Sequence, residues 1–232
     1  MKKLLVIAVV GSAMLQPASA SAAATSTGVV VARSGHLVAV AAPSGAVRTV
    51  NTRSKVRVGA RVRVTGSLLR VVGRARSAHV HGVVVRRLRG RLVIGAGRSL
   101  VTMRLGSRQL SSADSGTSTP ALGTAVDATA SLSSGQLDLT SIKTGGTVGS
   151  IQIQATVQAV APGVIVLNVN GQSIAFGVPA GITLPASLVG QTVTLNLNLT
   201  GTRPVATPGQ GGQDDDDEDD DEDDDDDEDD DD

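Results

Sequence analysis

The fold is decided by one stretch of sequence, Gly28-Val-Val-Val-Ala-Arg-Ser-Gly35-His-Leu-Val38, which has two further versions along the chain. The second version is Gly82-Val-Val-Val-Arg-Arg-Leu-Arg-Gly90-Arg-Leu-Val93, and a looser third is Ala155-Thr-Val-Gln-Ala-Val-Ala-Pro-Gly163-Val-Ile-Val166. Each version has an apolar run, a turn that contains Gly, and a second apolar run, which is the pattern of a β-hairpin. A pattern repeated at this spacing predicts three copies of one structural unit.

A second motif follows each hairpin: an apolar residue, Gly, two variable residues and Val. It occurs as Val58-Gly59-Ala-Arg-Val62, Leu122-Gly123-Thr-Ala-Val126 and Val189-Gly190-Gln-Thr-Val193. Apolar and polar residues alternate in residues 151–158 and 194–200, as in strands with one buried face. Asn170-Gly171 is typical of a two-residue type I′ turn. These patterns predict an all-β protein of tandem small OB-like or antiparallel β-barrel units.

The repeats divide the body into three predicted units. Unit 1 covers residues 25–80 and is basic, unit 2 covers 81–148 with a basic first half and a Ser/Thr-rich insertion at 107–120, and unit 3 covers 149–202 and is near neutral. Residues 76–80 and 136–142 are candidates for the last strands of the first two units. Because Gly201, Pro204 and Pro208 follow the final clear strand of unit 3, we expect its barrel to lack a last strand and to stay open or borrow an edge.

The third unit resembles a bacterial family known as domain of unknown function 5666. The resemblance covers Ala155 to Leu199 best and rests on a strand, a Gly turn, the hairpin Val169-Asn170-Gly171-Gln172 and a late Gly-x-x-Val strand. The first two units resemble the family less, because neither has the Asn-Gly hairpin. The resemblance implies small β-barrel modules in exported bacterial proteins and implies no activity.

The two ends of the chain differ from the body. Residues 1–24 have a positive start, an apolar run of about 12 residues and small residues, typical of a signal peptide cleaved after Ala20, Ala22 or Ala24. A membrane span needs about 20 apolar residues, and this run is shorter, so we expect no transmembrane segment. We therefore expect export, to the outside of the cell or to the envelope or periplasm. Residues 203–213 are predicted to be a flexible linker, and 214–232 a disordered acidic tail.

The net charge of −1 conceals a separation of charge along the chain. Residues 25–110 contain sixteen Arg and one Lys and no acid, whereas all nineteen residues of 214–232 are Asp or Glu. The other acids are Asp114, Asp127 and Asp138. The tail and the basic region therefore form two oppositely charged parts of one chain.

Residues 55–64 alternate cationic and apolar side chains, which predicts a row of positive charge on the outer face of a strand. A second basic cluster follows at the next hairpin. We call the following seven residues the Arg face: Arg57, Arg61, Arg63, Arg86, Arg87, Arg89 and Arg91. Such a face suits a polyanion such as nucleic acid, an anionic envelope polymer or an anionic lipid surface. It is equally consistent with a solvated cationic surface that keeps a Val-rich barrel soluble.

Nucleic acid is not the expected physiological partner. Barrels that hold single strands usually stack bases on aromatic side chains, and Phe176 is the only aromatic residue of the chain. Export would also separate the protein from intracellular nucleic acid. The acidic tail could instead occupy the Arg face and limit access by other polyanions, serve only as a solubilising segment, or collect Ca²⁺ weakly and multivalently. We expect no cofactor beyond such Ca²⁺.

Few residues could support chemistry. His79 and His81 are two apart, so on a strand both imidazoles face the same side. A metal site would need a third ligand, for which the chain offers His36 or a distant Asp. We therefore favour the alternative, that His79 and His81 are two surface residues in a Gly- and Arg-rich junction between units. Asp127 and Asp138 could face one another as an acid–base pair, or be outward polar positions. We therefore assign no catalytic or metal residue and expect an exported, non-enzymatic binding or structural module. A Ca²⁺- or mineral-associated protein that acts through its tail is the alternative, and an enzyme using Asp127/Asp138 or His79/His81 the second alternative.

Overall fold

The protein is almost entirely β in the part that the computed structural model describes, residues 25–106, 120–201 and 203–209. The predicted signal peptide, nearly all of the Ser/Thr-rich insertion and the acidic tail lie outside the described residues. Across the described ranges, no helix is both long and apolar enough to cross a membrane.

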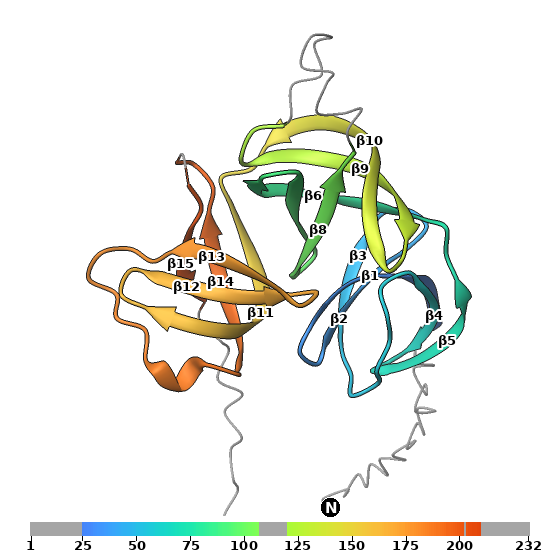
Figure 1. Cartoon of the computed structure of the whole chain (residues 1–232), viewed down its shortest axis with the longest axis horizontal. Coiled ribbons are helices and arrows are strands. Elements are labelled where there is room, and N and C mark those ends of the chain that lie inside the picture. Colours follow the sequence, from blue (N-terminus) through green and yellow to red (C-terminus); the bar gives the residue numbers. More distant parts are fainter. Residues whose placement is uncertain (1–24, 107–119, 202, 210–232) are drawn as a thin grey trace, which may run out of the picture.

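The strands form three sheets that follow each other along the chain (Figure 1). The first sheet contains β1 (Thr25–Ser34), β2 (Leu37–Ala41), β3 (Val47–Asn51), β4 (Ala60–Thr65) and β5 (Leu68–Arg74). The second and third sheets each close into a barrel and are called the second and third barrels. The second barrel contains β6 (Ser77–Leu88), β7 (Arg91–Ala96), β8 (Ser99–Leu105), β9 (Thr124–Ser133) and β10 (Gln136–Thr147). The third barrel contains β11 (Ser150–Ala161), β12 (Val164–Val169), β13 (Gln172–Gly177), β14 (Thr192–Asn198) and β15 (Val205–Pro208), with the 3₁₀-helix η2 (Ala186–Leu188) before β14.

All three sheets have the same strand order. The first three strands form an antiparallel meander, the fourth pairs with the first, and the fifth pairs with the fourth. In the second and third barrels the fifth strand also pairs in parallel with the third, through β8–β10 and β13–β15, and this pairing closes the barrel. This is the Greek-key order of a small OB-like barrel, and the predicted fold class is confirmed.

Two predictions about the last strands are wrong. The third barrel does not lack its last strand: β15 pairs with β14 and closes the barrel, so residues 205–208 are not linker. Proline is compatible with this strand because Pro204 precedes it and Pro208 ends it, and strand ends tolerate the missing N–H. Residues 77–80 do not end the first unit; they begin β6, which pairs with β9 of the second barrel. The first sheet, not the third, is open, between β3 and β5.

The two repeated motifs are joined by the same hydrogen bond in all three units. Each hairpin has a register shift in its first strand, which is a β-bulge that bends the strand. The shifts fall at Val30/Ala32, Val84/Arg86 and Val157/Ala159. The Gly of the second motif donates its N–H to the carbonyl oxygen at the bulge at 2.8 Å each time: Gly59 to Val30, Gly123 to Val84 and Gly190 to Val157. Each of these three glycines has a positive φ, which explains why Gly occupies this position.

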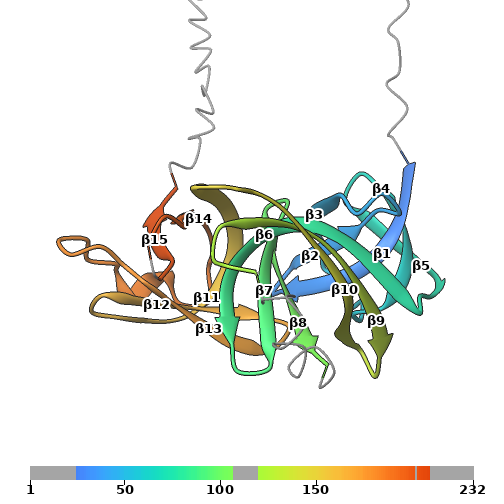
Figure 2. The ribbon, with the colours of Figure 1, turned by 90° about the horizontal axis from the view of Figure 1, so that it is seen from above.

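The hydrophobic core is divided between the interior of the first sheet and a larger shared core. Seven valines fill the inner side of the first sheet: Val30, Val38, Val40, Val50, Val56, Val62 and Val64. The opposite side of β1 and β2 packs into a cluster that also contains the interiors of the second and third barrels. All five residues of β2 are buried as a result. The three sheets therefore pack into one body, as Figure 2 shows from above.

Polar contacts connect the first sheet to the third barrel. Ser34 donates from Oγ to the carbonyl oxygen of Asn168 at 2.6 Å and accepts from the N–H of Thr156 at 2.8 Å. The backbone N–H of Arg33 donates to Oδ1 of Asn170 at 2.6 Å, and the N–H of Asn170 donates to the carbonyl oxygen of Arg33 at 2.7 Å. The φ angles of Asn170 and Gly171 are 53° and 75°, which confirms the predicted type I′ turn.

Candidate functional site: a cationic groove and a histidine–aspartate cluster

The alternation predicted for the basic strand is present in β4. Arg61 and Arg63 are exposed, and the valines between and after them are buried in the core of the first sheet. Arg63 lies directly opposite Arg70 of β5 in the antiparallel ladder. The outer side of β4 and β5 is therefore a region of concentrated positive charge, in which the two opposed arginines repel each other.

Three cations of the first sheet line a groove of about 670 Å³ between that sheet and the β9–β10 turn of the second barrel. Lys55 and Arg57 precede β4, and Arg74 ends β5. The rest of the lining is apolar or uncharged, and no carboxylate belongs to it. We call this hollow the cationic groove; its lining includes residues of the edge strand β5.

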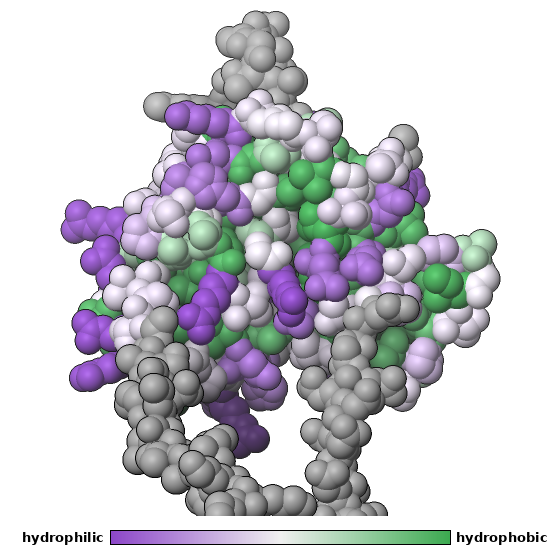
Figure 3. Space-filling view, turned by 180° about the vertical axis from the view of Figure 1, so that it is seen from behind, coloured by the Kyte–Doolittle hydropathy of each residue, from purple (hydrophilic) through white to green (hydrophobic). Residues whose placement is uncertain are grey.

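The Arg face is divided in the structure. Arg57 lines the cationic groove, whereas Arg61 lines a different hollow beside His79. Arg63 is exposed on β4. The remaining four members lie at the β6–β7 turn, where Arg87 and Arg89 are exposed and Arg86 and Arg91 are half-buried. Figure 3 shows hydrophilic side chains projecting along the side of the molecule that the first sheet forms, as well as elsewhere on this face.

The second barrel partly neutralises its own cross-strand arginine pair. Arg91 lies opposite Arg104 between β7 and β8, and Nε of Arg104 lies 3.9 Å from Oδ1 of Asp138. This is the one ion pair that joins an Arg to an acid among the described residues. The Arg63–Arg70 pair of the first sheet has no such carboxylate in the same ranges.

Asp127 and Asp138 do not face one another, which removes the acid–base pair that the sequence left open as one of two alternatives. In the β9–β10 ladder Asp127 pairs with Lys143, and Asp138 pairs with Ser131. Ser131 is four residues from Asp127 along β9, which corresponds to roughly 13 Å. The register of the hairpin therefore separates the two carboxylates.

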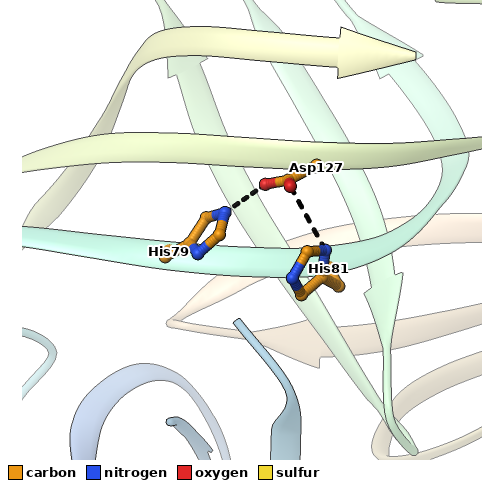
Figure 4. Close-up of side chains that lie close together, drawn as sticks. All are labelled: His79, His81 and Asp127. Atoms are coloured by element: carbon orange, nitrogen blue, oxygen red, sulfur yellow. Dashed lines mark hydrogen bonds and ion pairs between the residues drawn. The ribbon is translucent and has the colours of Figure 1, made fainter. Parts of the chain in front are cut away.

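Asp127 instead joins the two histidines (Figure 4). His79 and His81 extend from the same face of β6, with ring centroids 4.7 Å apart, and Asp127 reaches them from β9. One carboxylate oxygen contacts Nε2 of His79, and the other lies 3.6 Å from Nδ1 of His81. The three side chains are 35%, 48% and 37% exposed respectively, so solvent reaches the cluster. His36, the other ligand considered from the sequence, is exposed in the β1–β2 turn and is not a member of this cluster.

The ring of His81 is held by the turn between β2 and β3 of the first sheet. Gly45 in this turn accepts a hydrogen bond from the N–H of His81 at 2.8 Å. A Cβ at Gly45 would lie 2.3 Å from Cδ2 and 2.7 Å from Nε2 of the His81 ring. The ring therefore packs on the glycine backbone, with its Nδ1 side directed to Asp127.

No protein-family model matches the chain, and no curated protein sequence does. The resemblance of residues 155–199 to domain of unknown function 5666 therefore stays a prediction.

The sequence patterns indicated only part of each site. The Arg face predicted from the sequence omits Lys55 and Arg74, although both lie in basic segments beside it. Nothing in the sequence indicates that Asp127 meets the histidines, because it is 48 residues from His79 in the chain. The available signal was the alternation of polar residues on the outer face of the second unit, which did not specify the strand register.

Proposed function

We propose that the chain is an exported, non-enzymatic binding module that holds an anionic polymer of the cell envelope through its cationic groove. The observation that carries this proposal is the lining of the groove, which has three cations and no carboxylate. The volume of about 670 Å³ is in the range of small-molecule pockets, and an open groove of this kind suits a segment of a longer chain.

The charge of the neighbouring surface supports the proposal. Arg63 and Arg70 oppose each other on the outer side of β4 and β5, and a polyanion that also reached this side would offset the repulsion between them. Release of counterions from the polymer would add a favourable, salt-dependent contribution to binding.

The acidic tail is proposed to compete with this partner. It supplies nineteen carboxylates and is covalently attached to the basic part of the chain. Its proposed role as a competitor rests on these two properties. Residues 209–232 span up to about 80 Å when extended, which exceeds the diameter of a body of this size, roughly 40 Å. A tethered segment has an effective concentration on the order of mM. Occupation of the groove by the tail would therefore be dynamic and sensitive to salt.

Heparin, as a probe polyanion, tests the proposal by titration at several salt concentrations. Deletion of residues 214–232 should raise the affinity at low salt, since the competing carboxylates are removed. Substitution of Lys55, Arg57 and Arg74 by Gln in the tail-deleted chain should then lower it by about 10-fold or more and reduce its salt dependence. The matched control replaces Arg86, Arg87 and Arg89 by Gln, which removes the same charge outside the groove.

Equal losses of affinity in the two triple variants would contradict the assignment to the groove and indicate binding by net charge alone. A titration with Ca²⁺ distinguishes the alternative function. If the tail-deleted chain loses Ca²⁺ binding and also loses its association with isolated envelope polymer, the protein acts through its tail and the proposal is wrong.

The export part of the proposal rests on the signal-peptide pattern of residues 1–24. It is in line with the resemblance of the third unit to a family of exported modules. Fractionation of cells that express the full chain tests it: the mature protein should begin at residue 21, 23 or 25 and be found outside the cytoplasm.

A further inference from the structure

We propose that His79, His81 and Asp127 form a binding site for a first-row transition-metal ion, with Zn²⁺ as the fitting probe. The inference is independent of the proposed polyanion function, because the cluster lies outside the lining of the cationic groove. It combines two imidazoles from β6 with one carboxylate from β9.

The distances fit a three-ligand site. One possible ligand atom from each residue lies within 4.8 Å of the others. Tetrahedral zinc with bonds of about 2.0–2.1 Å brings ligand atoms to about 3.3–3.4 Å from each other. Since Asp127 already contacts Nε2 of His79 and lies 3.6 Å from Nδ1 of His81, small side-chain rotations on two paired strands suffice.

The surroundings select one nitrogen of each ring. Nε2 of His81 packs against Gly45, so Nδ1 is the nitrogen left to bind the ion, beside Asp127. His79 offers Nε2 to the same carboxylate. The two ligand nitrogens thus converge on one side of Asp127, on rigid strands and not on loops.

The donor types select the class of metal. Imidazole nitrogen with one carboxylate suits Zn²⁺ and its neighbours in the first transition row, whereas Ca²⁺ and Mg²⁺ prefer sites built from oxygen alone. Three protein ligands leave at least one coordination position for water or another ligand. His79 also lines a hollow of about 530 Å³ that contains Arg61, so an anion could approach the ion from that side.

The test is a competition between the full-length chain and a chromophoric zinc chelator, which counts only sites tighter than the carboxylates of the tail. The wild-type chain should bind one Zn²⁺ in this assay. His81→Ala and Asp127→Asn should each weaken binding at least about 100-fold, since even residues that only orient ligands change metal affinity 10–100-fold. His36→Ala is the matched control and should bind as the wild type does.

Asp127→Asn separates a metal site from a hydrogen-bonded cluster, because Asn still bonds to imidazole but is a poor zinc ligand. Thermal unfolding without metal should be the same for all variants, since the three side chains are partly exposed. Saturating Zn²⁺ should raise the unfolding temperature of the wild type and of His36→Ala alone. Equal zinc affinity in the wild type, His81→Ala and Asp127→Asn, or no binding tighter than that of the tail, would overturn the proposal.

Discussion

Asn170 performs two roles that a substitution can separate. Its backbone adopts a positive φ in the β12–β13 turn, and its side chain accepts a hydrogen bond from the backbone of Arg33 in the first sheet. Glycine can adopt the first role without the second. The residue therefore connects a local turn to the packing of the first sheet against the third barrel.

Asn170→Gly should lower the free energy of unfolding by about 1 kcal/mol, the contribution of one hydrogen bond. Asn170→Ala should lower it by about 2 kcal/mol or more, because an alanine in this conformation adds about 1–2 kcal/mol of strain. Urea unfolding of both variants measures the difference. Equal losses would show that the turn conformation contributes little at this position.

Asp127 of the proposed metal site also depends on its contacts with a distant segment. Nothing in its neighbours along β9 indicates a metal ligand, and in the β9–β10 ladder it pairs with Lys143. Only the pairing of β9 with β6 brings it to His79 and His81. Side-chain chemistry at this site is therefore a consequence of strand register.

At the scale of elements, two turns of the second barrel provide a matched pair of glycines. Gly90 in the β6–β7 turn and Gly97 in the β7–β8 turn both have a positive φ, 71° and 57°. A Cβ at Gly90 would meet nothing within 4 Å, whereas a Cβ at Gly97 would lie 2.3 Å from the carbonyl oxygen of Val47 in β3. The second turn is therefore pressed against the first sheet.

Gly97→Ala should destabilise the protein by about 1–3 kcal/mol more than Gly90→Ala does. Both variants share the backbone strain of a positive φ, and the difference is the cost of overpacking against backbone that cannot rotate away. Denaturant unfolding of the two variants under the same conditions gives this difference directly. A Gly97→Ala variant no less stable than Gly90→Ala would contradict the packing of this turn on β3.

The open first sheet is the element-scale feature that differs most from expectation. Its last strand, β5, pairs only with β4 and exposes Leu68, Val71 and Val72. Exposed apolar edges favour association between chains, and charged side chains on such edges oppose it. Arg70 and Arg74 on the same strand supply this protection, and Arg74 also lines the cationic groove.

At the scale of the whole molecule, the shared core couples the three sheets. One buried cluster includes Val31 of the first sheet, Ile94 of the second barrel and Ile153 of the third. Backbone bonds also cross each boundary, as between His81 and Gly45 and between Gln154 and Arg98. None of the sheets would bury its apolar outer side alone.

Thermal unfolding of the tail-deleted chain should therefore be one cooperative transition. Separating any one sheet would expose the shared core to water, which is unfavourable. Partly unfolded states should therefore be sparsely populated. Differential scanning calorimetry tests this expectation by comparison of the calorimetric and van't Hoff enthalpies, which should agree. Two or three resolved transitions would show that the sheets unfold independently.

The organisation within each unit could be predicted from the sequence because it depends on near neighbours. Alternation in β4 follows from the two faces of a strand, and the turn at Asn170 from its tolerance of positive φ. The repeated order of these signals was sufficient for the all-β class and for three small OB-like units. The last strands of the first and third units were predicted wrongly, since residues 77–80 and β15 acquire their place by pairing with distant strands.

The sequence alone thus determined that this chain forms three similar β units and carries a strongly divided charge. The tertiary structure alone decided which barrels close, that β2 is buried on both faces, and which side chains meet. The physical reason is register: a shift of one residue between β6 and β9 would move Asp127 to the opposite face from its partners, and no local pattern specifies that alignment. The cationic groove and the histidine–aspartate cluster are both products of this long-range pairing and packing.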